Sequence, residues 1–501
     1  MSSSSPSSPE ARKNASSLLK PFNRLLLKSF TLLTAIVAGA ALLPAQTTVN
    51  FTQTPYNSGD YSSDLIVSGD FNNDGILDIV TINPTTLSFY KGVGKGVYAN
   101  AVTQTIPTNY GAGGGIFAAD FNGDGKLDLA VSYGYGGGSS VLILLGNGKG
   151  GFTQGTPITV SGNAEAMALA DFNGDHKPDI AISDNQSNQT WVYVGKGDGT
   201  FTLTDTLKNG GLSLVAGDFN ADGKQDLVFA GGNGSDALGI YLGNGNGTFG
   251  APVLSSLTNV SSLAVGDFYN NRIQTIAVLN STISGFYVHS LRYSNGALYV
   301  ENENFIGDPS AGGPFALAAG DLNGDFLFDI FLAGGSQNAS GYTAYMIGNG
   351  NGTFQSPQTP PNNGAGIAYV SPFIRDLNRD SRHDVGMAWQ TLGEGGAEIL
   401  LNTSATTNCN PPAANKLSAV ICAPSPGQIV SPTYTFKGAG NAFNGIVKRM
   451  ELWIDGKKVG QNLEDQLKVT TPLTKGQHTA SFVVVDSFDE YTSTSVTFSA
   501  N

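Results

Sequence analysis

The sequence is poor in the residues that usually carry catalysis or covalent cross-links. Only 13% of its 501 residues are charged, and it contains two cysteines, four histidines and three tryptophans. Two cysteines cannot cross-link a chain of this length, so the main fold must depend on packing, on bound metal ions, or on both. The chain also has 40% hydrophobic residues and 66 glycines, which excludes a disordered polymer and favours many short strands joined by tight turns.

The N-terminal residues 1–45 have the composition of a targeting segment. Basic residues between Arg12 and Lys28 precede an apolar stretch from Phe30 to Leu43, and Ala45 offers a small-residue cleavage site. This order is typical of a signal peptide. Because the apolar stretch is short for a membrane span, cleavage is favoured over an uncleaved anchor. We therefore expect a secreted or cell-surface protein with no membrane span after cleavage.

The chain has a negative net charge. It is −13 for the whole sequence and becomes more negative when the basic residues of segment 1–45 are removed. Such acidity argues against nucleic acids and anionic membranes as partners.

A nine-residue pattern occurs seven times between residues 70 and 384. In its full form Asp occupies positions 1, 5 and 9 and Asn occupies position 3, with a short apolar run on each side. We call these segments aspartate loops 1–7; they begin at Asp70, Asp120, Asp171, Asp218, Asp267, Asp321 and Asp376. Successive loops begin 47 to 55 residues apart. Four short strands fit into each interval, which is typical of propeller blades, with a solenoid as the alternative.

Glycine turns of the form GNGNGTF recur in the same units, and each ends in an aromatic residue. We expect this aromatic to anchor the outer strand on the neighbouring sheet. The four residues concerned are Phe152, Phe201, Phe249 and Phe354.

These motifs resemble the FG-GAP/VCBS repeat family, which is related to the propeller of integrin α chains. Phe249-Gly250-Ala251-Pro252 spells the FG-GAP motif itself. The resemblance covers residues 47–403 and implies an all-β, seven-bladed propeller with calcium in the aspartate loops. The last unit ends at Asn402 without an outer strand, whereas Val49 to Tyr56 resembles the outer strand of an earlier unit. We therefore predict that the N-terminal strand completes the seventh blade.

The aspartate loops have the donor set of a calcium site. Three carboxylates and an Asn oxygen surround one centre in each loop, and the carbonyl of position 7 can join them. Carboxylates so close together repel unless a cation lies among them. Mg²⁺ prefers a tighter octahedron with more water, and Asx turns without metal are the structural alternative. The predicted ligands are Asp70, Asn72, Asp74, Ile76, Asp78, Asp120, Asn122, Asp124, Lys126, Asp128, Asp171, Asn173, Asp175, Lys177, Asp179, Asp218, Asn220, Asp222, Lys224, Asp226, Asp321, Asn323, Asp325, Leu327, Asp329, Asp376, Asn378, Asp380, Arg382 and Asp384.

The loops differ at position 6, where a sharp turn is needed. Loops 1, 2 and 4 have glycine there (Gly75, Gly125 and Gly223). Loops 3, 6 and 7 have His176, Phe326 and Ser381. We expect weaker calcium binding in these three. Loop 5 has Tyr269, Asn271 and Thr275 at positions 3, 5 and 9, so we expect about six structural Ca²⁺ sites in the chain and none in loop 5.

A second domain follows the repeats. Residues 404–414 form the predicted linker, and strand-like runs in residues 415–501 fit a β-sandwich. The run from Arg449 to Phe488 resembles bacterial immunoglobulin-like domains. In an exported chain Cys409 and Cys422 are expected to form a disulfide that ties the linker to the first strand.

The function predicted from these features is binding rather than catalysis. None of the four histidines lies near a Ser or Cys nucleophile motif, although propellers also host polysaccharide lyases and hydrolases, and a scaffold without a ligand is a third reading. We expect the face opposite the aspartate loops to bind carbohydrate or a cell-surface protein, as in adhesion. Aromatic residues that could stack on sugars there, or simply pack, are Tyr110, Tyr133, Tyr135, Trp191, Tyr342 and Trp389.

Overall fold

The computed structural model describes most of the chain after residue 48. The described residues are 49–58, 65–106, 112–133, 140–231, 238–282, 284–307, 313–335, 341–360, 368–391, 394–404, 409, 416–442, 447–463 and 465–501. All regular elements in these ranges are strands. None of the described residues belongs to a helix that could cross a membrane. The predicted signal peptide and most of the predicted linker lie outside these ranges.

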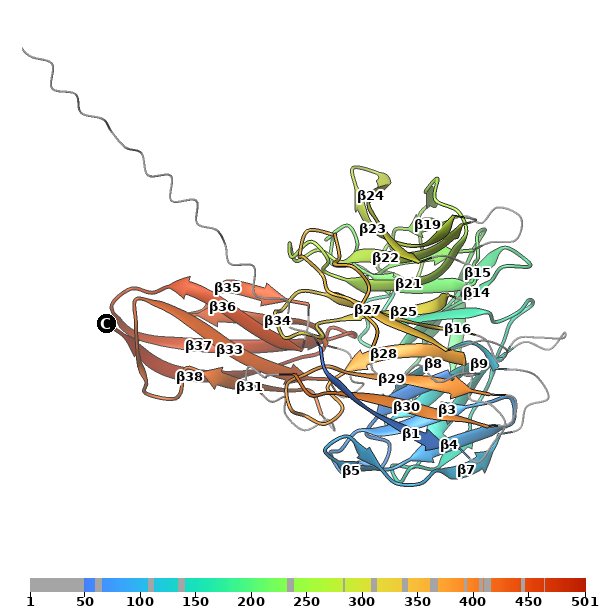
Figure 1. Ribbon diagram of the computed structural model, residues 1–501, viewed down its shortest axis with the longest axis horizontal. Coiled ribbons are helices and arrows are strands. Elements are labelled where there is room, and N and C mark those ends of the chain that lie inside the picture. Colours follow the sequence, from blue (N-terminus) through green and yellow to red (C-terminus); the bar gives the residue numbers. More distant parts are fainter. Residues whose placement is uncertain are drawn as a thin grey trace, which may run out of the picture. The chain divides into compact units, whose positions relative to one another are not determined.

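The repeat region consists of small antiparallel sheets, which Figure 1 shows side by side. We number the repeats 1–7 after their aspartate loops. Repeat 1 contains β2 (Leu65–Gly69), β3 (Asp78–Ile82), β4 (Thr86–Tyr90) and β7 (Val102–Thr105), with a side hairpin of β5 (Gly92–Gly94) and β6 (Val97–Tyr98). Repeat 2 contains β8 (Ala112–Ala119), β9 (Asp128–Tyr133), β10 (Ser140–Gly146), β11 (Phe152–Gln154) and β12 (Ile158–Thr159). Repeat 3 contains β13 (Ala166–Ala170), β14 (Asp179–Asp184), β15 (Gln189–Gly195) and β16 (Phe201–Leu207).

The remaining repeats follow the same order of strands. Repeat 4 contains β17 (Ser213–Gly217), β18 (Asp226–Ala230), β19 (Leu238–Tyr241) and β20 (Val253–Leu254). Repeat 5 contains β21 (Val260–Gly266), β22 (Thr275–Thr282), β23 (Gly285–Ser294) and β24 (Ala297–Gly307). Repeat 6 contains β25 (Pro314–Gly320), β26 (Asp329–Gly334) and β27 (Tyr342–Met346). Repeat 7 contains β28 (Ala368–Arg375), β29 (Asp384–Gln390), β30 (Gly395–Asn402) and the N-terminal β1 (Phe51–Asn57).

The first strands of the repeats contact one another in a closed cycle. Each of β2, β8, β13, β17, β21 and β25 contacts the first strand of the next repeat, and β28 contacts β2. The arrangement is therefore propeller-like. The N-terminal β1 supplies the fourth strand of repeat 7: it pairs antiparallel with β30 from Phe51 opposite Asn402 to Asn57 opposite Gly396 (Figure 1). The predicted pairing of the N-terminal strand with the last repeat is confirmed.

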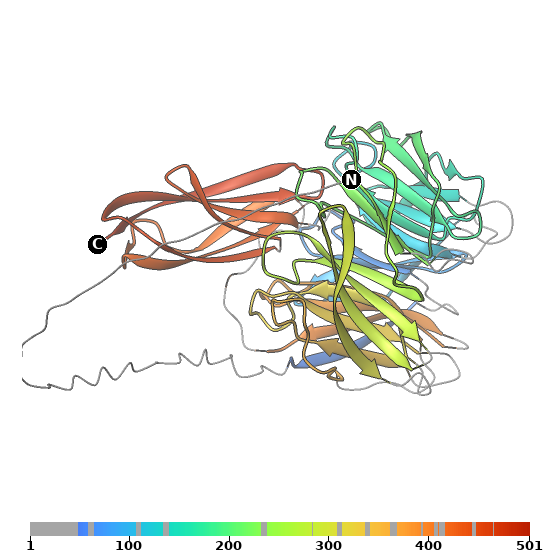
Figure 2. The same ribbon diagram turned by 90° about the horizontal axis from the view of Figure 1, so that it is seen from above.

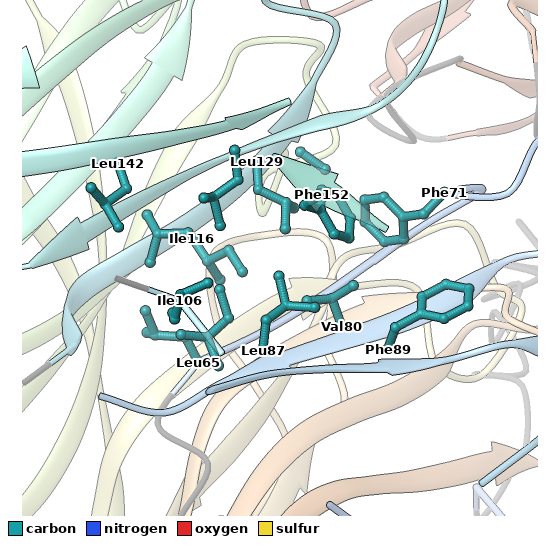
Figure 3. Packing of buried hydrophobic residues seen from close by; sticks show 14 of the residues in the cluster. Leu65, Phe71, Val80, Leu87, Phe89, Ile106, Ile116, Leu129, Leu142 and Phe152 are labelled. Carbon is teal, nitrogen blue, oxygen red and sulfur yellow. The ribbon is translucent and has the colours of Figure 1, made fainter. Parts of the chain in front are cut away.

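Apolar side chains fill the space between neighbouring sheets. Figure 3 shows Leu65, Val80 and Leu87 of repeat 1 packed against residues of repeat 2. The Phe at position 2 of the loop also packs edge-to-face on the aromatic that follows the next repeat's glycine turn; the Phe71 and Phe152 ring centroids lie 5.7 Å apart. The same contact joins Phe121 to Phe201, Phe172 to Phe249 and Phe268 to Phe354. The predicted anchoring role of these aromatics is confirmed.

The C-terminal residues form two further sheets, drawn in red in Figure 2. One contains β31 (Ser418–Ala423), β33 (Thr433–Asn441) and β36 (Gln466–Pro472). The other contains β32 (Ile429–Val430), β38 (Tyr491–Ala500), β37 (Gly476–Asp486), β34 (Val447–Ile454) and β35 (Lys457–Asn462). Their inner faces share one core, which includes Phe436 and Phe482. We call this part the C-terminal sandwich. Cys409 and Cys422 form the predicted disulfide, which ties the preceding segment to β31.

Candidate metal centres in the aspartate loops

Each aspartate loop connects the first two strands of its repeat. Position 9 is the first residue of the second strand, where the chain has entered the core. The six aspartates at this position are 0% exposed: Asp78, Asp128, Asp179, Asp226, Asp329 and Asp384. A buried carboxylate needs compensation, because removing it from water costs several kcal/mol unless partners replace the water.

Backbone amides provide part of this compensation. In loop 1 the Asp78 carboxylate accepts hydrogen bonds from the amide N–H of Phe71 at 3.0 Å and from that of Gly92 at 2.7 Å. The Asp70 carboxylate accepts from the amides of Asp74 at 3.0 Å and Gly75 at 2.7 Å. Loops 2, 3, 4, 6 and 7 repeat both pairs of contacts. The carboxylates therefore fix one loop conformation, repeated around the cycle.

Position 6 has a positive φ in all seven loops. The angle is 83° at Gly75, 74° at Gly125 and 85° at Gly223. It is 64° at His176, 68° at Arg272, 70° at Phe326 and 69° at Ser381. The predicted sharp turn is confirmed. Residues with a side chain are strained in this region of the Ramachandran map, so four loops carry a conformational cost that the glycine loops avoid.

Loop 5 keeps this shape with fewer charges. The Thr275 hydroxyl replaces the position-9 carboxylate: it accepts a hydrogen bond from the amide of Phe268 at 3.2 Å and donates one to the carbonyl of Gly266 at 2.8 Å. A neutral hydroxyl satisfies the buried end of the loop without a cation. Because of these two hydrogen bonds, loop 5 keeps its conformation without the carboxylates that the other loops have at positions 5 and 9.

In the other six loops the buried carboxylates carry an electrostatic cost. Burial, together with a smaller contribution from the carboxylates at positions 1 and 5, raises the pKa of Asp78, Asp179 and Asp226 to about 7. Burial likewise raises the pKa of Asp128 to about 6 and those of Asp329 and Asp384 well above the usual range. A divalent cation beside each group would offset both the desolvation and the repulsion.

In loops 1, 2, 3, 4 and 7 the carboxylate at position 5 is paired with a basic side chain, whereas in loop 6 the Asp325 carboxylate accepts a hydrogen bond from the Asn323 side-chain amide. Lys126 Nζ lies 2.8 Å from Asp124, and Lys177 Nζ lies 3.4 Å from Asp175. Within the described ranges, no group of three or more His, Cys, Asp or Glu side chains is gathered as a metal cluster. The carboxylates instead accept hydrogen bonds from the backbone amides of the loop and form ion pairs with basic side chains. The donor set itself, with carboxylate, amide and carbonyl oxygens, fits a hard cation such as Ca²⁺ in chemistry.

The aromatic residues predicted for sugar stacking are mostly core residues. Tyr133, Trp191 and Trp389 are 2%, 4% and 7% exposed, and the Trp389 indole N–H donates to the carbonyl of Ala397. Their rings are not available to a ligand, because sheets cover both faces of the strands that carry them, and the expectation for these three is corrected. Tyr342 is half-buried, and burial raises its pKa to about 12. Tyr110 and Tyr135 lie outside the described residues.

Sequence reasoning missed a cavity of about 400 Å³ at the centre of the cycle. It is lined by the ends of β13, β17, β21, β25 and β28 next to the aspartate loops, and by residues of the C-terminal sandwich. Arg375 lines it and donates to the Ser68 hydroxyl at 3.2 Å. Burial lowers the Arg375 pKa to about 10, so the guanidinium stays cationic at neutral pH. One signal was visible: Arg375 precedes loop 7, whereas Gly or Ala precedes every other loop.

The sandwich contacts three of the aspartate loops. His176 Nδ1 in loop 3 lies 2.8 Å from the carbonyl oxygen of Phe488. Lys468 Nζ lies 5.4 Å from the centre of the Phe326 ring in loop 6. Loop 7 forms two more contacts. The Ser381 carbonyl accepts a hydrogen bond from the side-chain amide of Gln466 at 3.1 Å, and His383 Nε2 lies 3.0 Å from the Asp465 carboxylate.

Comparison with known proteins places these loops in a family. The FG-GAP-like repeat matches residues 70–131, 130–182, 171–229, 218–278 and 321–387. Cartilage acidic protein 1 of Xenopus tropicalis is 23% identical over 298 residues, which are 53% of this chain and 45% of that protein. Phosphatidylinositol-glycan-specific phospholipase D of Rattus norvegicus is 30% identical over 173 residues, which are 27% of this chain and 20% of that protein. The chain thus spans less than half the length of these relatives.

Solved structures give only distant likeness. An Agrocybe aegerita lectin that recognises non-reducing terminal N-acetylglucosamine aligns with a TM-score of 0.43 at 18% identity, over 71% of this chain and 94% of that one. A Bacillus licheniformis rhamnogalacturonan lyase aligns with a TM-score of 0.42 at 14% identity, over 72% and 76%. Likeness at this level says nothing of function. The sequence match to the repeat, in contrast, extends over more than half of the chain, and the chain belongs to the FG-GAP-like repeat family.

Proposed function

We propose that this chain is an exported, calcium-stabilised seven-bladed β-propeller with an immunoglobulin-like C-terminal domain, and that it binds an extracellular carbohydrate or surface protein. The observation that carries the calcium part is the repeated aspartate loop. Six loops bury a position-9 carboxylate near the carboxylates of positions 1 and 5, and each of the three accepts hydrogen bonds from its own backbone amides, as in loop 1. Membership of the FG-GAP-like repeat family supports the same reading.

In each of these loops the ion would be held by the side chains of positions 1, 3, 5 and 9 and by the carbonyl of position 7. Calcium supplies the positive charge that offsets burial and repulsion of the carboxylates. The ions would then stabilise the native state by mass action, because the unfolded chain has no assembled site. Their role is structural, and the binding chemistry lies elsewhere.

The closed cycle of first strands and the pairing of β1 with β30 support a seven-bladed propeller. The two packed sheets of the sandwich support an immunoglobulin-like assignment. Export is supported by the composition of residues 1–45 and by the Cys409–Cys422 disulfide, a bond that persists in oxidising compartments.

We place the ligand on the end of the propeller opposite the aspartate loops. The sandwich covers part of the loop end through its contacts with loops 3, 6 and 7, so the opposite end is the larger free surface. Residues 83–85 and 185–188, which connect the second and third strands of repeats 1 and 3 at that end, include Asn, Gln, Ser and Thr, which are suited to adaptable hydrogen bonding with sugars or peptides.

Two measurements test the proposal. Isothermal titration of the chelated full chain with Ca²⁺ should give about six sites, and removal of calcium should lower the melting temperature. A screen against glycans and cell-wall material, with and without EDTA, should then find a ligand that is retained only with calcium. Absence of calcium uptake would refute the structural part. Release of unsaturated sugars from polyuronates would replace the binding function by a lyase.

A further inference from the structure

In the acidic loops, a residue other than glycine at position 6 coincides with a contact to the sandwich; loop 5, which lacks the acidic ligands of positions 5 and 9, has Arg272 there. Among the six acidic loops, loops 3, 6 and 7 lack glycine there, and these three contact the sandwich. In loops 2 and 4 a Cβ atom built on Gly125 or Gly223 would meet no atom within 4 Å, so their turns end in open space. The two sets of loops therefore differ in their surroundings as well as in sequence: position 6 faces open space in loops 2 and 4 and lies at the sandwich in loops 3, 6 and 7.

In loops 3 and 6 the position-6 side chain forms a contact that glycine could not form, whereas loop 7 contacts the sandwich through the Ser381 backbone carbonyl. The His176 imidazole bonds the Phe488 carbonyl, and the Phe326 ring lies under the Lys468 ammonium group. A positive φ costs about 1 kcal/mol for a residue with a side chain. Because His176 and Phe326 keep this conformational cost at the positions that contact the sandwich, we infer that the contact offsets it. Loss of glycine here is then a feature of docking and not a decay of the metal site.

Apolar anchors reinforce the polar contacts on both sides of the central cavity. The Phe488 side chain is 7% exposed and packs in the core cluster formed by repeats 2 and 3. Leu463 packs against the cluster formed by repeats 5 and 6. In a cycle of seven, repeat 3 lies opposite repeats 6 and 7. The sandwich therefore spans the cycle and lines the cavity between its two anchors through Val447 and Lys448.

The docking residues donate backbone hydrogen bonds directly to proposed calcium ligands. The amide of His176 donates to Asp171 at 2.8 Å, that of Phe326 to Asp321 at 2.7 Å, and that of Ser381 to Asp376 at 2.8 Å. Each acceptor is the position-1 carboxylate of its loop. Whatever orders that carboxylate also orders the turn that carries the docking group.

We propose that loops 3, 6 and 7 are the docking platform of the C-terminal sandwich, and that calcium in these loops holds the sandwich over the central cavity. The idea rests on the calcium sites of the proposed function. With calcium bound the three turns are fixed and the sandwich covers the cavity. Without calcium the carboxylates of each loop repel, the turns move and the sandwich is released.

The test uses the full chain and follows docking by small-angle X-ray scattering and by the rate of proteolysis within residues 404–414. Calcium-loaded protein should be compact and slowly cleaved, and EGTA should increase the maximum dimension and raise the cleavage rate about tenfold, the equivalent of 1.4 kcal/mol of lost docking. The double variant His176→Gly and Phe326→Gly should behave like the EGTA sample even with calcium present. Its calcium stoichiometry by titration should remain that of the parent chain, because no ligand side chain is changed.

Two further variants keep the test decisive. Phe488→Ala removes the aromatic ring that packs against repeats 2 and 3 and should therefore release the sandwich. Tyr491→Ala, at a residue of β38 that is 74% exposed, is the matched control and should leave the scattering and the cleavage rate unchanged. Unchanged scattering and cleavage in the glycine variant, together with a higher melting temperature, would overturn the docking role. Calcium uptake with identical scattering in calcium and EGTA would overturn the coupling while leaving the proposed function intact. Failure to take up calcium at all would overturn both.

Discussion

Glu398 provides a quantitative test of how the N-terminal strand is held. It lies on β30, between β1 and β29, opposite Pro55 on one side and Met387 on the other. Its side chain is 3% exposed, and burial raises its pKa from 4.5 to about 7, with the Gln53 side chain of β1 opposing part of the effect. The carboxyl group is therefore neutral in the folded protein over a range in which it is ionised in the unfolded chain.

The sign of the pH dependence follows from this difference. A carboxyl whose folded pKa is raised contributes its full stability below the unfolded value, and that stability is lost as the pH rises through the folded value. From pH 5 to pH 8 the parent chain should lose about 2 to 3 kcal/mol through Glu398 alone, since each pKa unit corresponds to 1.36 kcal/mol. Glu398→Gln keeps the shape and removes the ionisation, so it should lose none of this amount.

The assay is calorimetric unfolding of both chains at pH 5 to 8 in saturating calcium, which keeps the aspartate loops alike in the two proteins. The difference in melting temperature between variant and parent should widen in favour of the variant by about 5 °C over this range. Glu303→Gln, at an exposed position of β24, is the control and should leave the pH profile of the parent. Parallel profiles for Glu398→Gln and the parent would refute the assignment of a neutral, buried Glu398.

Four other outcomes are expected. Deletion of residues 47–57 should lower the melting temperature by about 5 to 10 °C, because repeat 7 loses its fourth strand; behaviour like the parent would refute closure by β1. Asp179→Asn should reduce the calcium stoichiometry by one in a titration, whereas Asp198→Asn, in an exposed glycine turn, should not. Thr275→Asp should destabilise loop 5 in urea unfolding by about 2 kcal/mol, since a carboxylate cannot donate to the Gly266 carbonyl; no loss would show that the hydroxyl contact is dispensable. Replacing Cys409 and Cys422 together by Ser should cost about 3 kcal/mol in the unfolding transition of the sandwich, and an unchanged transition would contradict this.

The parts of the fold that could be predicted from the sequence are those that depend on short motifs within one repeat. The aspartate loops and the strands on either side of them repeat within a few residues, so the all-β repeat could be inferred without knowing any distant contact. The pairing of β1 with β30 was predictable because the missing outer strand of repeat 7 has a counterpart before repeat 1. The disulfide was predictable because Cys409 and Cys422 have no other partner in the chain.

Burial of the aromatics could not be predicted in the same way. Every residue of β9 and β14 is buried, because neighbouring sheets cover both faces. The alternation that normally separates inner from outer residues is then absent, and Tyr133 at the end of β9 gives no sign of the face it occupies. Residues that looked suited to a ligand by type were therefore core residues by position.

The residues at position 6 show why the sequence of a single loop is not enough to explain its departure from the repeat pattern. Considered alone, His176 or Phe326 in place of glycine is a strained turn and indicates a weakened calcium loop. The structure gives the same residues a second environment, the sandwich, which comes from a segment about 150 to 300 residues later in the chain. No spacing in the repeats encodes that contact. If the docking role holds, the turn strain and the interdomain contact balance each other, so changing all three loops to glycine should raise the stability of the repeats while lowering the affinity of the sandwich for them. A decayed metal site would predict only the first of these two changes, and so measuring both on the same variant separates the two explanations.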